Sequence, residues 1–158
     1  ADIHSNIFDH YDCDSLDNLK KLEDRLEISP SATRRLAAFT NDNLKSQLRF
    51  SNKIAKAHKV LREEAISKKD AAELSYRYND KVALDIILVR SSLNSTEFDD
   101  SVFSRIELGS AAKFPIKSVD LVQYFSGRKL GEMLSCLEQK WIESDFTLNK
   151  ETLMSTIR

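Results

Sequence analysis

One stretch of the chain decides the fold, and it reads Asn79-Asp80-Lys81-Val82-Ala83-Leu84-Asp85-Ile86-Ile87-Leu88-Val89-Arg90-Ser91-Ser92-Leu93. Asn79 or Asp80 can cap the start of a helix. Apolar residues then fill nearly every position from Val82 to Val89, which leaves the helix almost no polar face. A helix that is apolar nearly all round is typical of the buried centre of an all-α domain. The stretch therefore predicts a central helix with other helices packed around it.

The segments on either side of this helix have helical periodicity. Apolar residues recur at helical spacing, and no segment alternates with period two as a strand would. Only three glycines and two prolines occur in 158 residues, which also favours helices over a sandwich or barrel. The expected neighbouring helices cover, approximately, residues 15–27, 32–39, 41–50, 52–67, 70–78 and 95–108.

A flexible joint is expected at Gly109-Ser110-Ala111-Ala112. It divides the chain into a helical body domain, residues 1–110, and a helical tail, residues 111–158. The predicted fold is all-α, a multi-helix bundle of about eight to ten helices with a C-terminal helix-turn-helix-like tail. The expected tail consists of helices at about 119–124, 129–144 and 149–156, with a Gly-bounded turn at Gly127.

Composition narrows the class of protein. The hydrophobic fraction of 41% and the charged fraction of 31% are those of an ordinary soluble domain. No apolar run has membrane-spanning length and no secretory signal is visible, so we expect a cytoplasmic protein without a membrane partner. Cys13 and Cys136 are predicted to be reduced thiols, buried or half-buried, although a disulfide is the alternative. The start at Ala1 rather than methionine suggests a piece of a longer protein.

No residue pattern predicts catalysis. Asp12-Cys13-Asp14 has the letters of a two-carboxylate metal motif but lacks the strand, third carboxylate and phosphate loop that such chemistry needs. His4, Asp9 and His10 could be read as metal ligands, but the chain has only three histidines, and His58 lies in a basic helix away from other candidate ligands, so no metal site is expected. No phosphate-binding or dinucleotide-binding glycine loop is present. We therefore expect no catalytic residue, no metal ligand and no cofactor in this chain.

Charge is unevenly distributed, although the net charge is only −1. Acidic side chains prevail in residues 1–30, and basic ones prevail in residues 41–69. A basic surface of this kind can contact the phosphates of a nucleic acid, giving affinity without base specificity. The alternative is an ordinary solvated helix face. The candidate phosphate contacts are Arg34, Arg35, Arg49, Lys53, Lys56, Lys59 and Arg62.

A second candidate lies at the start of the 129–144 helix. Gly127, Arg128 and Lys129 combine two cations with the free N–H groups of a helix N-terminus, which suits a phosphate. The alternative is a plain turn glycine followed by a packing glycine at Gly131. Trp141 is in phase with the apolar residues of this helix and is expected in the core.

The tail carries a set of motifs that resembles the C-terminal signature of class II tRNA nucleotidyltransferases and bacterial poly(A) polymerases. The closest resemblance is to the α-proteobacterial type. Upstream, Arg34 to Ala38 and Leu48 to Asn52 resemble two further motifs of that branch. The tail motifs are Phe114-Pro115, Asp120-Leu121, Gly127 with Gly131, Leu134 with Leu137-Glu138, Trp141-Ile142 and Asp145-Phe146.

The resemblance implies that this chain is the body and tail of such an enzyme and that it binds tRNA. These parts would hold the acceptor and T arms of tRNA by their backbone and position the 3′ end for nucleotide addition. The N-terminal head domain, which is absent here, would add CCA or poly(A) from CTP and ATP with Mg²⁺. The alternative is a helical protein-interaction or DNA-binding module without a catalytic role. In that case the helix-turn-helix would be Val119–Ser144.

Overall fold

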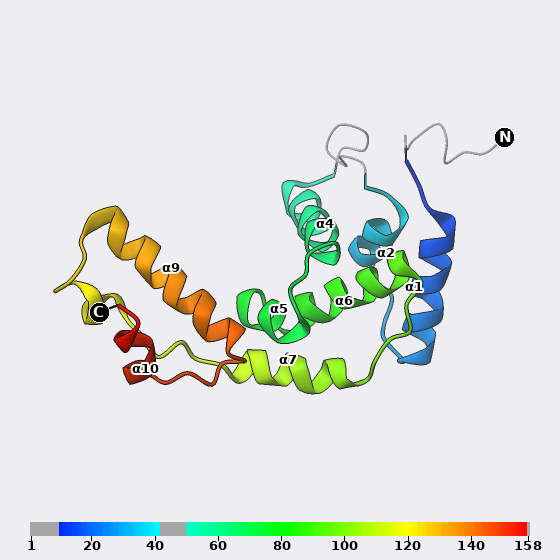
Figure 1. Ribbon diagram of the computed structural model, residues 1–158. Helices are drawn as coiled ribbons and strands as arrows, with labels where there is room; N and C mark the ends of the chain where they lie inside the picture. The colour runs from blue at the N-terminus through cyan, green and yellow to red at the C-terminus, as the bar shows by residue number, and fades with distance from the viewer. Residues whose placement is uncertain (1–9, 42–49, 158) are drawn as a thin grey trace. The chain divides into compact units, whose positions relative to one another are not determined.

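The computed structural model describes residues 10–41 and 50–157. Within these ranges it contains nine α-helices and no strand, so the all-α prediction is confirmed. The chain forms two compact units, residues 1–110 and 111–158 (Figure 1). The helix expected at about 41–50, and the candidate Arg49, lie outside the described residues.

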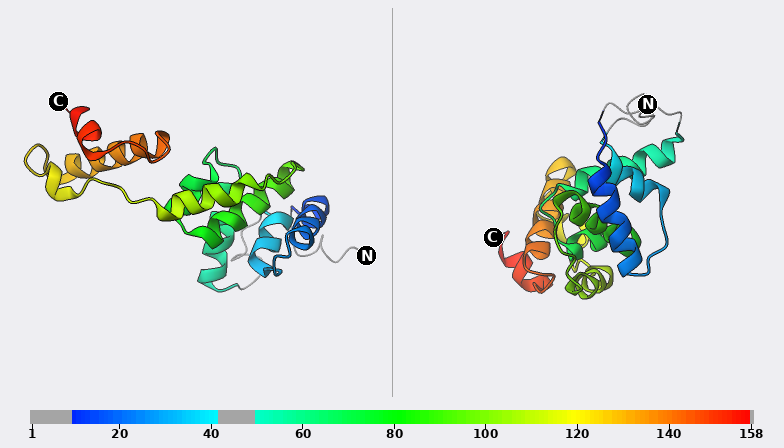
Figure 2. Two further views of the ribbon diagram at one scale, coloured as in Figure 1. Left: turned by 90° about the horizontal axis from the view of Figure 1, so that it is seen from below. Right: turned by 90° about the vertical axis from the view of Figure 1, so that its right-hand side faces the viewer.

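Unit 1 is organised around α6, Asp80–Asn94. This helix packs against α1, α2, α4 and α5, and Figure 2 shows these helices gathered about it. Ile86, Leu88 and Val89 have no exposed surface, which confirms the predicted central helix. The other helices of unit 1 are α1 (Cys13–Arg25), α2 (Ala32–Phe39), α4 (Asn52–Ala65), α5 (Ala71–Arg77) and α7 (Ser101–Ala111).

Short polar side chains fix where five helices of unit 1 begin. Each of them accepts a hydrogen bond from the backbone N–H three residues later, at 2.8–3.4 Å. Such caps satisfy donors that a helix start leaves unpaired, and each contributes about 1 kcal/mol. The capping residues are Asp12, Ser31, Ser51, Asp70 and Asn79.

The start of α7 differs from the prediction. A helix from residue 95 was expected, but Ser95 has φ of 51° and ends α6 in the left-handed conformation. The backbone N–H of Thr96 donates to the Ser91 carbonyl, which closes that end. Residues 96–100 then run as a connection that buries Phe98, before α7 begins at Ser101.

Gly109 is not the flexible joint that was expected. It lies inside α7, and a Cβ at this position would be only 2.0 Å from the Ala72 carbonyl oxygen. Glycine is required here because the α7 backbone packs directly on the α5 backbone. The boundary between the two units, after Ser110, does fall within the predicted stretch, but sequence does not show that Gly109 itself serves close packing.

Unit 2 contains α8 (Ser118–Leu121), α9 (Gly127–Glu143) and α10 (Lys150–Ser155). Trp141 is 3% exposed, as predicted for a core residue, and packs between two other aromatic rings. Its ring centroid is 5.5 Å from that of Phe114 and 5.0 Å from that of Phe146, the second contact being edge-to-face. The half-buried Phe114 and Phe146 thus pack on Trp141, and the aliphatic side chains of Leu121, Leu137 and Leu153 complete the core of this unit.

Two further predictions concern the cysteines and membrane-spanning segments. Both cysteines are free, but Cys13 and Cys136 are exposed rather than buried or half-buried. Among the helices described in residues 10–41 and 50–157, none has the length and apolar character needed to cross a membrane.

Candidate nucleic-acid interface

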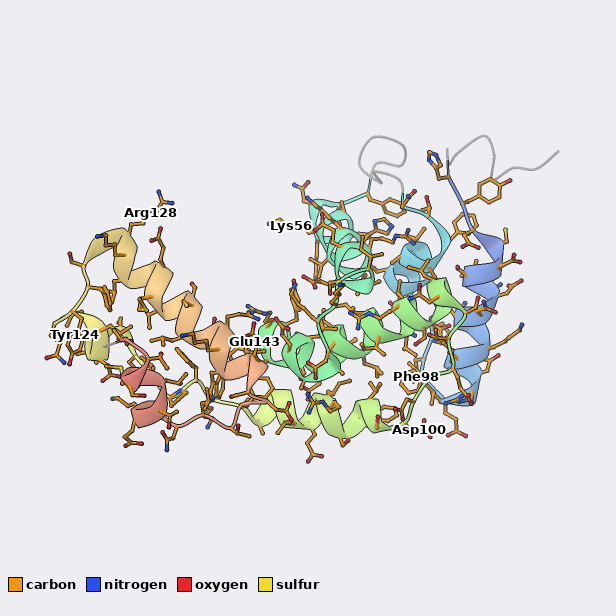
Figure 3. All side chains as sticks on the ribbon, in the orientation of Figure 1. Lys56, Phe98, Asp100, Tyr124, Arg128 and Glu143 are labelled. Carbon is orange, nitrogen blue, oxygen red and sulfur yellow. The ribbon has the colours of Figure 1, made fainter. Side chains whose placement is uncertain are left out.

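Helix α4 separates its side chains into a buried face and a cationic face. His58, Leu61 and Ala65 are 2–5% exposed and face the core of unit 1. Lys53, Lys56 and Lys59 are exposed, and the spacing of three residues spreads them over one side of the helix. Figure 3 shows Lys56 extending outward from α4. We call these three lysines the α4 lysine face.

Two side chains of α4 anchor the helix to the end of α2. The His58 Nε2 atom lies 2.9 Å from the Thr40 carbonyl oxygen. Arg62 donates from Nη1 to the Ala37 carbonyl oxygen at 2.9 Å. Arg62 is half-buried, and burial lowers the pKa of its guanidinium, partly offset by the charge of Asp12. Arg62 is therefore not part of the α4 lysine face.

Arg90 of α6 holds the C-terminal end of α4. Its guanidinium donates to the carbonyl oxygens of Glu64, Ala65 and Lys69 at 2.8–3.1 Å. A cation that binds the last carbonyls of a helix satisfies acceptors that would otherwise lack partners. This contact fixes the direction of α4 within the unit.

The Glu64 carboxylate lies at the same end of α4. It accepts from Lys69 Nζ at 2.6 Å and from the Tyr78 hydroxyl at 2.8 Å. Burial would raise the pKa of Glu64, but these hydrogen bonds outweigh burial and hold the pKa below its ordinary value. The middle and the C-terminal end of α4 are thus held to its neighbours, which orients its outer face.

The lysines of the outer face are available to a ligand. No described residue forms an ion pair with Lys53 or Lys56. Lys59 lies 3.6 Å from Glu63, but the two side chains are 72% and 63% exposed. Such an exposed pair contributes little and exchanges readily for another anion.

Arg34 must be removed from the candidate surface. Its side chain is 3% exposed and donates to Glu23 Oε1 from Nε at 2.9 Å and from Nη2 at 2.5 Å. Nη1 donates to Asp85 at 2.6 Å, and Nη2 also donates to the Ser29 carbonyl at 2.7 Å. Because these partners use the guanidinium inside the fold, Arg34 has no means of reaching a phosphate.

Arg35 belongs to the edge of the same network. Its Nε donates to Glu23 Oε2 at 2.8 Å, and the side chain is 36% exposed. Glu23 is thereby shared by two arginines although it is itself only 1% exposed. Arg35 is half-exposed but already paired, so it is a weaker candidate than the α4 lysines.

The second candidate, at the start of α9, is fully open to solvent. Gly127 has φ of 56°, and nothing lies within 4 Å of a Cβ built on Gly127 or Gly131. Gly131 is therefore not a packing glycine. Ser126 precedes the helix without a side-chain cap, and Lys129 is exposed. Arg128 is 92% exposed and pairs with Glu132 at 2.7 Å.

Sequence reasoning missed a hollow in unit 2 beside Tyr124. This ring is 48% exposed and helps to line a space of about 520 Å³ against α10. The helix expected at about 119–124 ends at Tyr124, whereas α8 ends at Leu121 and leaves Tyr124 in the turn that follows. Its exposure depends on where α10 packs, which the sequence does not give.

No group of three or more potential metal ligands exists among the described residues, 10–41 and 50–157. No family model, no curated protein and no solved structure matches the chain.

Proposed function

We propose that this chain binds the phosphate backbone of RNA through the α4 lysine face. The observation that carries the proposal is the separation of charge on α4: the helix is anchored by its inner face, while three exposed lysines share the outer side. Fixed cations on a helix surface neutralise phosphates and release condensed counterions, which gives affinity without sequence specificity.

We further propose that the RNA is tRNA and that the chain is the body and tail of an enzyme that resembles tRNA nucleotidyltransferases. The support for this step is the motif set of the tail. Three of its aromatic residues, Phe114, Trp141 and Phe146, pack together. The purified chain is then expected to bind tRNA but to add no CCA or poly(A) when given CTP, ATP and Mg²⁺. Measurable addition would contradict this assignment.

The alternative, a recognition helix for duplex DNA, is less well supported by α9. Base reading in the major groove requires several free polar side chains on one helix face. Here Glu132 is paired with Arg128, and Gln139 donates to Glu143 at 3.1 Å. The two acids would also repel the phosphates. Tighter binding of duplex DNA than of tRNA in the same buffer would favour this alternative.

A charge-reversal pair tests the proposed function directly. Lys53→Glu with Lys56→Glu is expected to weaken tRNA binding at least tenfold, because it removes two contacts and adds two repulsions. The matched control is Lys21→Glu with Lys81→Glu, two exposed lysines on α1 and α6 that change the net charge equally. If both pairs weaken binding to the same extent, net charge rather than the α4 lysine face governs affinity.

A further inference from the structure

The hollow beside Tyr124 lies in unit 2 and uses none of the residues of the α4 lysine face. Its lining mixes an aromatic ring and apolar side chains with polar groups, and its volume is within the roughly 300–1,000 Å³ usual for small-molecule sites. The lining residues are Tyr124, Lys150, Glu151, Met154, Ser155 and Ile157.

The walls of this hollow are held in place by hydrogen bonds. The backbone N–H groups of Tyr124 and Phe125 both donate to the Leu121 carbonyl at 2.9 Å, which fixes the turn after α8. Lys150 at the start of α10 donates to Asp120 of α8 at 2.6 Å. Leu121 of α8 and Leu153 of α10 have no exposed surface, so both helices are packed into unit 2. The hollow is therefore preformed within unit 2.

The polar groups argue against a purely apolar occupant. Glu151 is exposed, and no described residue forms an ion pair with it. Ser155 donates its hydroxyl to the Thr152 carbonyl at 2.7 Å, so its oxygen can still accept a hydrogen bond. An aliphatic side chain in this hollow would desolvate these groups without replacing their water, which is unfavourable.

The chemistry of the lining matches a flat aromatic group with polar edges. Tyr124 presents a half-exposed ring for stacking, and Figure 3 shows its position beside α8. The Met154 and Ile157 side chains supply apolar contact, while the Glu151 carboxylate can accept from an exocyclic amino group. Bases stack on aromatic side chains in this way when single-stranded nucleic acid is bound.

The charge of the chain segment that carries Tyr124 favours an occupant with phosphates. Residues 113–130, which include Tyr124, carry the cations Lys113, Lys117, Arg128 and Lys129 against the single acid Asp120. Asp120 is already paired with Lys150. The segment that bears the stacking ring is therefore basic.

We propose that this hollow binds an unpaired nucleobase of single-stranded RNA, with the base stacked on Tyr124 and an amino group of adenine or cytosine bound by Glu151. The proposal shares its RNA partner with the proposed function but not its residues, so the two can fail separately. The hollow binds only unpaired RNA, whereas the α4 lysine face binds the phosphates of single-stranded and duplex RNA alike.

The test measures binding of the full chain to a fluorescein-labelled oligoadenylate of about ten nucleotides, alone and annealed to its complement. Tyr124→Ala is expected to weaken binding of the single strand about tenfold and to change duplex binding less than twofold. Tyr124→Phe, which keeps the ring, is expected to bind like the wild type. Lys53→Glu with Lys56→Glu should weaken both forms.

Three results would overturn the proposal. The first is unchanged single-strand binding by Tyr124→Ala. The second is an equal loss with Tyr124→Ala and Tyr124→Phe. The third is a dimer of the wild-type chain in sedimentation that Tyr124→Ala dissociates, because the hollow would then hold a second copy.

A measurement on the wild-type chain tests the proposal without depending on the folding of a variant. Added AMP is expected to shift the ¹³C-methyl NMR signal of Met154 in the hollow while leaving Met133, on α9, unchanged. Glu151→Gln is expected to reduce the preference for oligoadenylate over oligouridylate, because an amide can also donate to the uracil carbonyl. No shift of Met154 at millimolar AMP would contradict the proposed site.

Discussion

The two compact units of this chain bury different kinds of side chain. Unit 1 encloses an ion network in which Glu23 and Arg34 are 1% and 3% exposed. Unit 2 is built around the aromatic contacts of Trp141 and leaves Val119, Val122 and Tyr124 largely open to solvent. A count of charges therefore overstates the cationic surface of unit 1. In unit 2, the informative feature is instead apolar surface that remains outside.

The largest expected effect comes from breaking the ion network of unit 1. Arg34→Ala would leave Glu23 and Asp85 without their shared guanidinium, and loss of one partner from a buried pair costs about 3–5 kcal/mol. Urea unfolding followed by circular dichroism measures this free energy. Arg128→Ala in unit 2 is the control, because its exposed pair should contribute less than about 1 kcal/mol. Equal costs for the two variants would contradict the contrast between the units.

Two glycines inside helices, one in each unit, should respond to substitution by alanine with opposite changes in stability. Gly109→Ala should destabilise unit 1 by about 1–3 kcal/mol, since its Cβ would collide with the Ala72 carbonyl. Gly131→Ala should stabilise unit 2 by about 0.5–1 kcal/mol, because alanine favours helix and nothing lies near the new Cβ. Thermal unfolding of both variants checks the signs. Stabilisation by Gly109→Ala would show that α7 and α5 are not in backbone contact.

A change of pH should have a smaller effect on stability, through the ionisation of Glu64. Because the folded pKa of Glu64 is depressed, its contribution to stability is present above the unfolded value near 4.5 and is lost as pH falls through the lower folded pKa. Glu64→Gln should therefore lower the free energy of unfolding by roughly 1 kcal/mol at pH 7, and the difference from wild type should vanish at low pH. A difference that does not change with pH would mean that the charge of Glu64 is not involved.

Local signals in the sequence were sufficient for the fold class and for most of the described helices. The apolar run from Val82 to Val89 predicted the central helix, and Ser31 and Phe39 bounded α2 as expected. Helix periodicity and capping act over a few residues, which is why they can be read from sequence. The start of α7 was misplaced because the left-handed Ser95 depends on how α6 ends.

The site could be predicted only in part, because contacts between distant residues decide which cations remain outside. Lys53, Lys56 and Lys59 were correctly placed on a helix surface by their spacing. Arg34 was not, since its partners Glu23 and Asp85 lie 11 and 51 residues away along the chain. Sequence spacing carries no information about such pairs.

The salt dependence of tRNA binding tests the central claim most directly. Lys53→Gln with Lys56→Gln removes two charges from the α4 lysine face without adding repulsion. If each lysine contacts a phosphate, the slope of log K against log salt should become shallower by about two, because about one counterion is released per contact. Lys21→Gln with Lys81→Gln should leave the slope unchanged. Parallel salt plots for wild type and the α4 variant would contradict the account.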